Sequence, residues 1–399
     1  MPLNQSFLTY LFLFLTLLPI LCFQFDIVNA IVSQIDHCSL LSCDFQRHYL
    51  PQVQRFVSEE SGFVSGWFYP PLLVFLLYPF HQLPNPEIWW TFFLLTITVC
   101  LSHTTHKYSK NVVSPFTSLL FMCISLPVIH CLKWGQISIL IVVGLIVALN
   151  TRGLWSGIIL GFLGALKLYP LLFVLPFLLQ KRHQECIAMM ISFLIWGILI
   201  PLIFMPIDQI IAYYQNAIHA SQNIQGMASG LGGQAIIPTA TRWFEDGSYG
   251  THVMDGGLIA NIPFLSSIFA LIVFIPSIFL LYKAPKNTFA PVLTFIFLSL
   301  LLSPGWEHYF CFIPYCWLVL YRESSSFQRI VLILMVLLQY VPLLHLLGYG
   351  ISFFVYAQWG GSTCILLIML CITWNLQYRY IKDNENQPVP IIPPKLLDC

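Results

Sequence analysis

Charged residues are scarce in this chain of 399 residues, because only 8% of them are Asp, Glu, Lys or Arg. A soluble globular domain carries about 25% charged residues, so the composition excludes a water-soluble globule. Hydrophobic residues make up 58% of the chain, and the mean hydropathy is +0.80. The apolar runs are continuous rather than alternating, which excludes a transmembrane β-barrel. We therefore predict an all-α polytopic membrane protein, since a helix satisfies its own backbone groups in lipid.

Several motifs are also missing, and each absence narrows the function. The chain has no Walker A motif, no dinucleotide fingerprint, no Cys-x-x-Cys pair and no His-Glu-x-x-His, so nucleotide binding and structural zinc lack support. The net charge of +1 says nothing about partners, and no basic patch in the sequence suggests nucleic acid. Most of the 12 cysteines lie in apolar runs. Cys38 and Cys43 lie in a polar loop instead, and a disulfide could join them in an oxidising compartment.

The apolar runs predict about ten full spans, since each crossing needs about 20 residues. The first run, 7–23, has no small-residue cleavage site after it and is read as a retained span. The other predicted spans are 88–102, 113–130, 136–150, 186–205, 262–282, 288–302, 309–321, 328–347 and 360–377. Two segments fit poorly: 67–83 is interrupted by prolines, and 154–180 carries Lys167 in its middle.

The distribution of basic residues indicates where both segments lie relative to the membrane, because loops rich in Lys and Arg favour the cytoplasmic side. We predict that 67–83 is a helix on the outer surface and that 154–180 is a hairpin of two half-helices. Most of the 17 basic residues then lie inside, most of the 16 acids lie outside, and Lys167 stays within the membrane. The prediction is one membrane domain, 1–378, with extracytoplasmic loops at 24–87 and 206–261 and a cytoplasmic polar tail at 379–399.

Four polar regions would meet at the outer face in this arrangement. They are the acid-bearing loop 24–66, the segment 130–136, the loop 206–261 and the segment 303–309. Their convergence predicts a functional site at that face. The Gly-rich loop 206–261 is interpreted either as a mobile flap over the site or as a linker.

Asp44 is the acid with the most suggestive neighbours. If its segment is helical, Asp44, His48 and Gln52 share one face by their spacing of four residues. A carboxylate beside an apolar surface can serve as a general base. The alternative is an ordinary solvated loop acid.

Lys167 and the pair Glu307–His308 are the other candidates. A lysine inside an uncharged membrane segment suggests pairing with an anion, whereas its alternative is a side chain that extends to the membrane surface. A histidine beside an acid can bind an anion or a metal, or relay a proton. A short polar turn between spans is the alternative for that pair.

Five short motifs along the chain resemble those of glycosyltransferase family 87, whose members have the GT-C fold and use polyprenyl-phosphate sugars. The motifs are Asp44-Phe45-x-x-His48-Tyr49, Tyr69-Pro70-Pro71-Leu72, Gly135-Gln136, Gly161-x-x-Gly164-Ala165-Leu166-Lys167-x-Tyr169-Pro170 and Ser303-Pro304-x-Trp306-x-His308. They occur in the family's order and extend over most of the chain.

The resemblance implies a reaction and a set of site residues. A hexose such as mannose would pass from a polyprenyl-phosphate sugar to a hydroxyl of a glycan or lipid acceptor, with inversion and with Asp44 as the base. Lys167 and His308 would lie near the donor phosphate. The further substrate-binding positions would be Gln136, Tyr69, Glu307 and His48.

The same resemblance implies a multi-pass protein of the bacterial inner membrane that needs no cofactor besides its lipid-linked donor. We expect no resident metal, since no ligand cluster stands out in the sequence. A membrane transporter or lipid flippase is the alternative, in which Lys167 and the acids would line a path. Transporters often contain paired inverted repeats, and none is detectable in the sequence.

Overall fold

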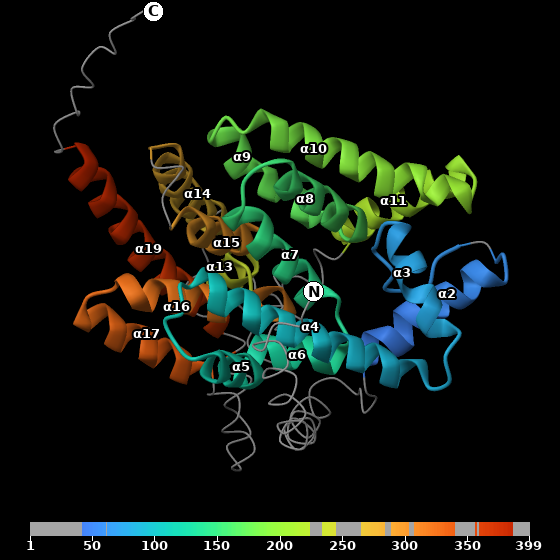
Figure 1. Ribbon diagram of the computed structural model, residues 1–399, viewed down its shortest axis with the longest axis horizontal. Coiled ribbons are helices and arrows are strands. Elements are labelled where there is room, and N and C mark those ends of the chain that lie inside the picture. Colours follow the sequence, from blue (N-terminus) through green and yellow to red (C-terminus); the bar gives the residue numbers. More distant parts are fainter. Residues whose placement is uncertain are drawn as a thin grey trace, which may run out of the picture.

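Helices form every regular element in the part of the chain that the structure describes. This computed structural model describes residues 42–60, 62–223, 234–244, 265–283, 289–302, 307–339, 356 and 359–385 (Figure 1). The all-α class is therefore confirmed for these ranges. The predicted first span, 7–23, lies outside them.

The N-terminal half begins with a short helical segment and continues through a series of apolar helices. The first group is η1 (Phe45–Tyr49), α2 (Leu50–Val57) and α3 (Leu72–His81). The second is α4 (Pro86–Tyr108), α5 (Pro115–Ile124), α6 (Leu126–Trp134) and α7 (Ser138–Asn150). The third is α8 (Leu154–Leu166), η2 (Tyr169–Val174), α9 (Leu175–Leu179), α10 (His183–Leu194), η3 (Ile195–Leu199) and η4 (Pro201–Ile203).

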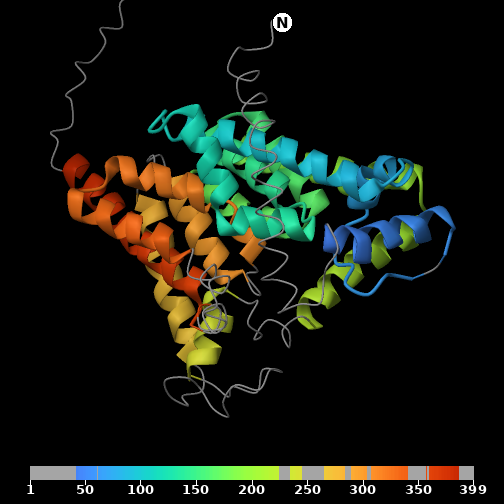
Figure 2. The same cartoon turned by 90° about the horizontal axis from the view of Figure 1, so that it is seen from below.

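The C-terminal half begins with α11, which lies beside α2, and its later helices pack on the other side of the molecule. Its elements are α11 (Ile207–Asn223), α13 (Ile236–Phe244), α14 (Leu265–Lys283), α15 (Ala290–Leu301), η5 (Glu307–Phe310), α16 (Ile313–Glu323), α17 (Ser326–Leu338) and α19 (Gly361–Glu385). Figure 2 shows α15 to α19, in orange and red, opposite the blue segment that holds η1 and α2. Helix α15 lies deepest, since almost all of its side chains are buried.

Four of the described helical segments are long and apolar enough to cross a membrane. They are Pro86–Tyr108, His183–Ile203, Leu265–Lys283 and Gly361–Asp383, and the bent pair α5–α6 would make a fifth. These helices support a polytopic membrane protein, but the predicted count of about ten full spans is not confirmed. Runs predicted as crossings fold as short helices: α7 has 13 residues and α15 has 12, against about 20 for a full span.

The predicted span 113–130 is not continuous. Helix α5 begins with an N-cap at Ser114, whose hydroxyl accepts from the Thr117 amide. The chain is extended at Ser125, and α6 leaves at an angle of 61° to α5. Pro127 accounts for the break, because it lacks the amide hydrogen that would continue the hydrogen bonds of α5, and its ring would clash with the preceding helical turn.

The hairpin predicted at 154–180 is confirmed. Helix α8 ends at Leu166, Lys167 is extended, and η2 and α9 lead back along α8. Both ends of the hairpin meet, since Arg152 and Gln180 line the same pocket. Pro170 accounts for the start of a new helical segment after Lys167, because it cannot donate the hydrogen bond that would continue α8.

Helix α8 packs against α10 in the closest helix pair of the fold (Figure 1). A β-carbon at Gly157 would lie 2.1 Å from the Glu185 carbonyl oxygen, and one at Gly161 would lie 2.3 Å from that of Met189. The spacing Gly-x-x-x-Gly therefore brings the two backbones together, as small residues do between membrane helices.

Two helices occupy parts of the segment 206–261, which the sequence had suggested to be irregular. Helix α11 packs near α2 and α3 through a hydrogen bond from Gln52 Nε2 to the Tyr213 hydroxyl, 3.1 Å long. Helix α13 packs against α14. The Gly-rich stretches 224–233 and 245–261 lie outside the described residues.

Helix α19 continues to Glu385, past the predicted start of the polar tail.

We predict that Gly161→Val destabilises the protein by about 3 kcal/mol or more, because the added methyl groups would collide with backbone atoms of α10. Thermal unfolding in detergent, followed by size-exclusion chromatography, measures the change. Leu154→Val on the same helix is the control, since Leu154 is 56% exposed. Equal melting temperatures for the two variants would contradict the close packing of α8 on α10.

Candidate functional site

Asp44 lies at the start of η1, which is a π-helical turn. Its Oδ1 is 3.9 Å from His48 Nε2, and its side chain keeps 17% of its surface exposed. The other ring nitrogen of His48, Nδ1, lies 2.6 Å from the Ser65 carbonyl oxygen, so it donates to that oxygen. His48 thus links Asp44 to the loop that precedes Trp67.

Gln52, which ordinary helical spacing would place on the face of Asp44, makes its hydrogen bonds to other parts of the chain. Its Nε2 donates to the Tyr213 hydroxyl, and its Oε1 accepts from the Val64 amide at 2.8 Å. A π-helical turn closes its hydrogen bonds over five residues rather than four. Later residues are therefore rotated away from the direction that ordinary helical spacing predicts.

Gln136 connects Asp44 to two buried tyrosines. Its Nε2 donates to Asp44 Oδ2. Its Oε1 lies 3.0 Å from the Tyr49 hydroxyl and 3.1 Å from the Tyr69 hydroxyl. The two hydroxyls are also 2.7 Å apart. The amide of Gln136 is thereby held in one orientation, with its NH2 group toward the carboxylate.

Gly135 places Gln136 in this position. It ends α6 with a φ of 68°, a left-handed conformation that glycine adopts at low cost. A β-carbon here would also lie 2.7 Å from the Ser42 Cβ. The Gly135 carbonyl accepts from Trp90 Nε1 at 2.8 Å, which ties the turn to α4.

Both tyrosines keep their protons at neutral pH. Burial raises the pKa of Tyr49 well above 10, and the neighbouring Tyr69 and Asp44 raise it further. Burial also raises the pKa of Tyr69, with added contributions from Tyr309 and Asp44. Each hydroxyl therefore keeps one proton to donate within the triangle that the two hydroxyls form with Gln136 Oε1.

Lys167 lies among three tyrosine rings at the break of the α8–α9 hairpin. Its Nζ is 4.3 Å from the centre of the Tyr309 ring, 5.2 Å from that of Tyr69 and 5.6 Å from that of Tyr169. Only 7% of the residue is exposed. The amine has no hydrogen-bond partner in the described part of the chain. Cation–π contacts are its main interactions, and they leave its three N–H donors unused.

His308 completes this group from η5. It is buried, its ring packs edge-on against Tyr309, and it stacks on His130 of α6 with 5.8 Å between ring centres. Glu307 is the first residue of η5, but the structure does not describe its side chain. The segment 303–306 also lies outside the described residues.

The predicted residues Asp44, Tyr69, Gln136, Lys167 and His308 thus come together, although they are far apart in the sequence. Tyr69 lies at the centre, because its hydroxyl bonds Gln136 while its ring faces the Lys167 amine. Asp44 is close enough to interact electrostatically with that amine. A carboxylate and an amine on opposite sides of one tyrosine can accept a proton and hold an anion in a single reaction. Among the described residues, no three His, Cys, Asp or Glu side chains are placed to hold a metal ion.

Cys43, next to Asp44, forms a disulfide. The eight other cysteines in the described part of the chain are free, so none of them is its partner. Cys38, the partner suggested by the sequence, lies outside the described residues.

Four aromatic residues of the site were not predicted from the sequence: Tyr49, Tyr169, Tyr309 and His130. Tyr49 and Tyr309 each follow a candidate histidine, Tyr169 comes two residues after Lys167, and His130 lies in the polar segment 130–136, which was the available signal. Their roles depend on which way the neighbouring helices face. Spacing alone could not reveal this, because α5 and α6 are bent and η1 is π-helical.

Comparison with known protein families gives one match. The sequence model of glycosyltransferase family 87 matches residues 67–304, more than half of the chain. The matched range contains Tyr69, Gln136 and Lys167, while Asp44 lies 23 residues before it and His308 lies four residues after it. Searches of curated proteins and of solved structures found no match.

We predict that Gln136→Leu lowers the free energy of unfolding by about 1–3 kcal/mol, because it leaves buried hydroxyls without their acceptor. Thermal unfolding of the purified protein measures the loss. Gln54→Leu is the matched control, because Gln54 is exposed on α2. A melting temperature for Gln136→Leu equal to that of the control would contradict the hydrogen-bond network.

Proposed function

Because the chain belongs to glycosyltransferase family 87, we propose that it transfers a hexose such as mannose from a polyprenyl-phosphate sugar to an acceptor hydroxyl. The observation that carries the proposal is the grouping of Asp44, Gln136, Tyr69 and Lys167 around one point. Such a transfer needs one group to take the acceptor proton and another to hold the departing phosphate.

In the proposed reaction, Asp44 accepts the proton of the acceptor hydroxyl. The acceptor oxygen then forms a bond to the anomeric carbon, while the bond from that carbon to the phosphate oxygen breaks. The electron pair of the broken bond leaves with the polyprenyl phosphate. A single displacement of this kind inverts the anomeric centre and requires no covalent intermediate.

The surroundings of Asp44 suit the role of a base. One carboxylate oxygen is held by Gln136, and the other faces His48 at 3.9 Å. The carboxylate is thus positioned by its neighbours while part of it stays accessible. A fixed base within hydrogen-bond reach of the substrate is the arrangement that proton transfer requires.

Lys167 suits the phosphate for an energetic reason. A buried ammonium group without an anion is costly, and a phosphate placed beside it would offset that cost. The tyrosine rings around Lys167 keep water away, which limits hydrolysis of the activated sugar. His308, beyond Tyr309, would contact the same phosphate in this proposal.

The proposed site faces the extracytoplasmic side of a bacterial cell membrane. The disulfide at Cys43 supports this orientation, since disulfides persist in oxidising compartments. The basic loops at the opposite end of the α8–α9 hairpin support it as well. The acceptor would be a glycan or a lipid that is accessible from that side.

We predict that Asp44→Asn lowers the rate of transfer by about 10²–10⁴-fold, because the amide cannot accept the acceptor proton. The measurement is transfer of labelled mannose from polyprenyl-phosphate mannose to lipid acceptors by the purified protein. Glu60→Gln, which alters an exposed acid of the same region, is expected to leave the rate unchanged. Transfer by Asp44→Asn at the wild-type rate would rule out Asp44 as the base.

We predict that Lys167→Met weakens the binding of polyprenyl phosphate by about 10–100-fold, the contribution of a charged hydrogen bond. Its melting temperature should match or exceed that of the wild type, because the change removes a buried charge that has no hydrogen-bond partner in the described part of the chain. Lys110→Met, at an exposed position, is the control. Unchanged binding by a well-folded Lys167→Met would show that the phosphate lies elsewhere.

A further inference from the structure

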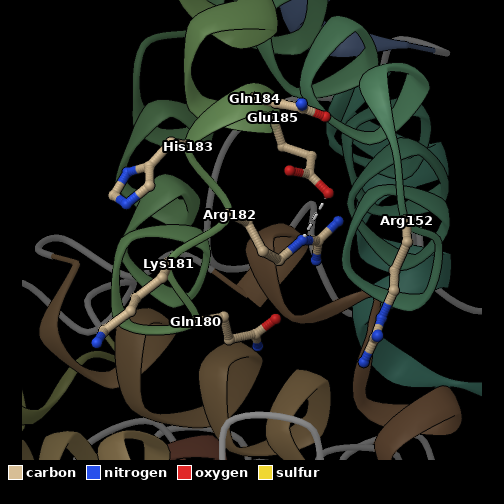
Figure 3. A pocket seen from close by; sticks show the side chains of 7 residues that line it. All are labelled: Arg152, Gln180, Lys181, Arg182, His183, Gln184 and Glu185. Carbon is tan, nitrogen blue, oxygen red and sulfur yellow. Dashed lines mark hydrogen bonds and ion pairs between the residues drawn. The ribbon is translucent and has the colours of Figure 1, made fainter. Parts of the chain in front are cut away.

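A basic pocket of about 540 Å³ lies at the end of the α8–α9 hairpin that is remote from Lys167 (Figure 3). Its lining comes from the turn before α8, with Arg152, and from the turn between α9 and α10, with Gln180, Lys181, Arg182, His183 and Glu185. Helix α8 has 13 residues and is therefore about 20 Å long. The pocket is thus separate from the candidate site at the other end of that helix.

Arg182 is engaged in holding the pocket together. Its Nε lies 3.0 Å from Glu185 Oε1, and its guanidinium also donates to the Thr151 carbonyl oxygen and the Ser156 hydroxyl. Glu185 accepts from the Gly153 amide in addition. The pair Arg182–Glu185 is neutral overall, and it fixes the two turns relative to each other.

Arg152 and Lys181 supply the uncompensated charge of the pocket. Both side chains are exposed, and neither has an ion pair or a side-chain hydrogen bond to any residue in the described part of the chain. Figure 3 shows Gln180 between Arg152 on one side and Lys181 on the other. Two cations and an amide therefore border the pocket, while its one acid, Glu185, is already paired with Arg182. The remaining positive charge favours an anionic ligand.

An apolar groove continues from the pocket along the outer side of α8 and α10. It also has a volume of about 540 Å³, and Gln184 lines both the groove and the pocket. Its remaining lining is mostly aliphatic and ends at a tryptophan: Leu154, Ile158, Ile187, Ile191, Ile195 and Trp196. The close approach at Gly157 and Gly161 fixes the two helices that form its walls.

The position of this pocket relative to the membrane follows from α10. The segment His183–Ile203 is long and apolar enough to cross a bilayer, so its first residues lie at one membrane surface. The pocket lies at that surface, and the groove descends beside the span into the hydrocarbon region. A ligand that fits both must have an anionic head and a hydrocarbon chain.

We propose that the pocket and the groove together bind one anionic glycerophospholipid of the surrounding membrane. Its anionic headgroup occupies the pocket, in the positive field of Arg152 and Lys181 at the two sides, and one acyl chain follows the groove past Ile187 and Ile191 to Trp196. The lipid thereby joins the α8–α9 hairpin to α10 on the side opposite Lys167. This binding depends on the membrane location and not on the proposed glycosyl transfer.

The test measures quenching of intrinsic fluorescence in the full-length protein, solubilised in detergent, by lipids with brominated acyl chains. Brominated phosphatidylglycerol is compared with brominated phosphatidylcholine. We expect phosphatidylglycerol to quench at lower mole fraction, and we expect Trp196→Phe to remove most of that difference, because Trp196 lines the groove. The assay requires no sugar donor, so its outcome is independent of enzymatic activity.

The double variant Arg152→Gln/Lys181→Gln should bind phosphatidylglycerol about 30-fold more weakly, at about fivefold for each cation near an anionic headgroup. The matched control is Lys107→Gln/Lys110→Gln, which removes two exposed cations from another turn. Melting temperatures verify that both variants are folded.

Three results would overturn the proposal. One is equal quenching by the two lipids in the wild type. Another is an equal loss of phosphatidylglycerol binding in both double variants, which would indicate general attraction to the protein surface. The third is that glycerol phosphate, which has no acyl chain, prevents quenching by brominated phosphatidylglycerol at the same concentration as unbrominated phosphatidylglycerol does. In that case the pocket binds a soluble anion and the groove contributes nothing.

Discussion

The burial of the Lys167 amine among three tyrosine rings is the constraint on which the rest of the site depends. An ammonium group in such a place needs other groups to replace its water, and aromatic faces do so here at a point where the helix ends. The helix ends before Pro170, and the aromatic faces are those of Tyr69, Tyr169 and Tyr309. These rings come from three separate segments. Covering the amine therefore requires the first loop, which carries Tyr69, and η5, which carries Tyr309, to pack against the hairpin.

Much of the fold could be predicted because it follows from local patterns. The apolar runs identified α4, α7, α10, α14 and α19, and the lysine within an apolar run identified the α8–α9 hairpin. Asp44 and Lys167 were chosen from the sequence for their position beside or within apolar segments, and the structure places them near each other. Their proposed roles rest on family membership and on this geometry.

Other features could not be predicted because they depend on tertiary packing. The π-helical turn at η1 and the hydrogen bond from Gln52 to Tyr213 of α11 are two examples, and no hydrophobic pattern reveals either of them. The bend between α5 and α6 divides a run that reads as one span. Hydrophobicity alone could not fix the number of crossings either, because a run buried within the protein and a run exposed to lipid have the same composition. Short helices such as α15 are buried by their neighbours.

The fixed orientation of Gln136 also restricts how this protein can evolve. A single-nucleotide change converts a glutamine codon into a glutamate codon, and the two side chains have nearly the same shape. At this position, however, the change would replace the NH2 group that faces Asp44 with a second carboxylate oxygen. Two carboxylates in hydrogen-bond contact cannot both remain ionised. One proton would be shared between them, and lineages carrying that otherwise minor mutation would lose an ionised Asp44 without any visible change in the fold.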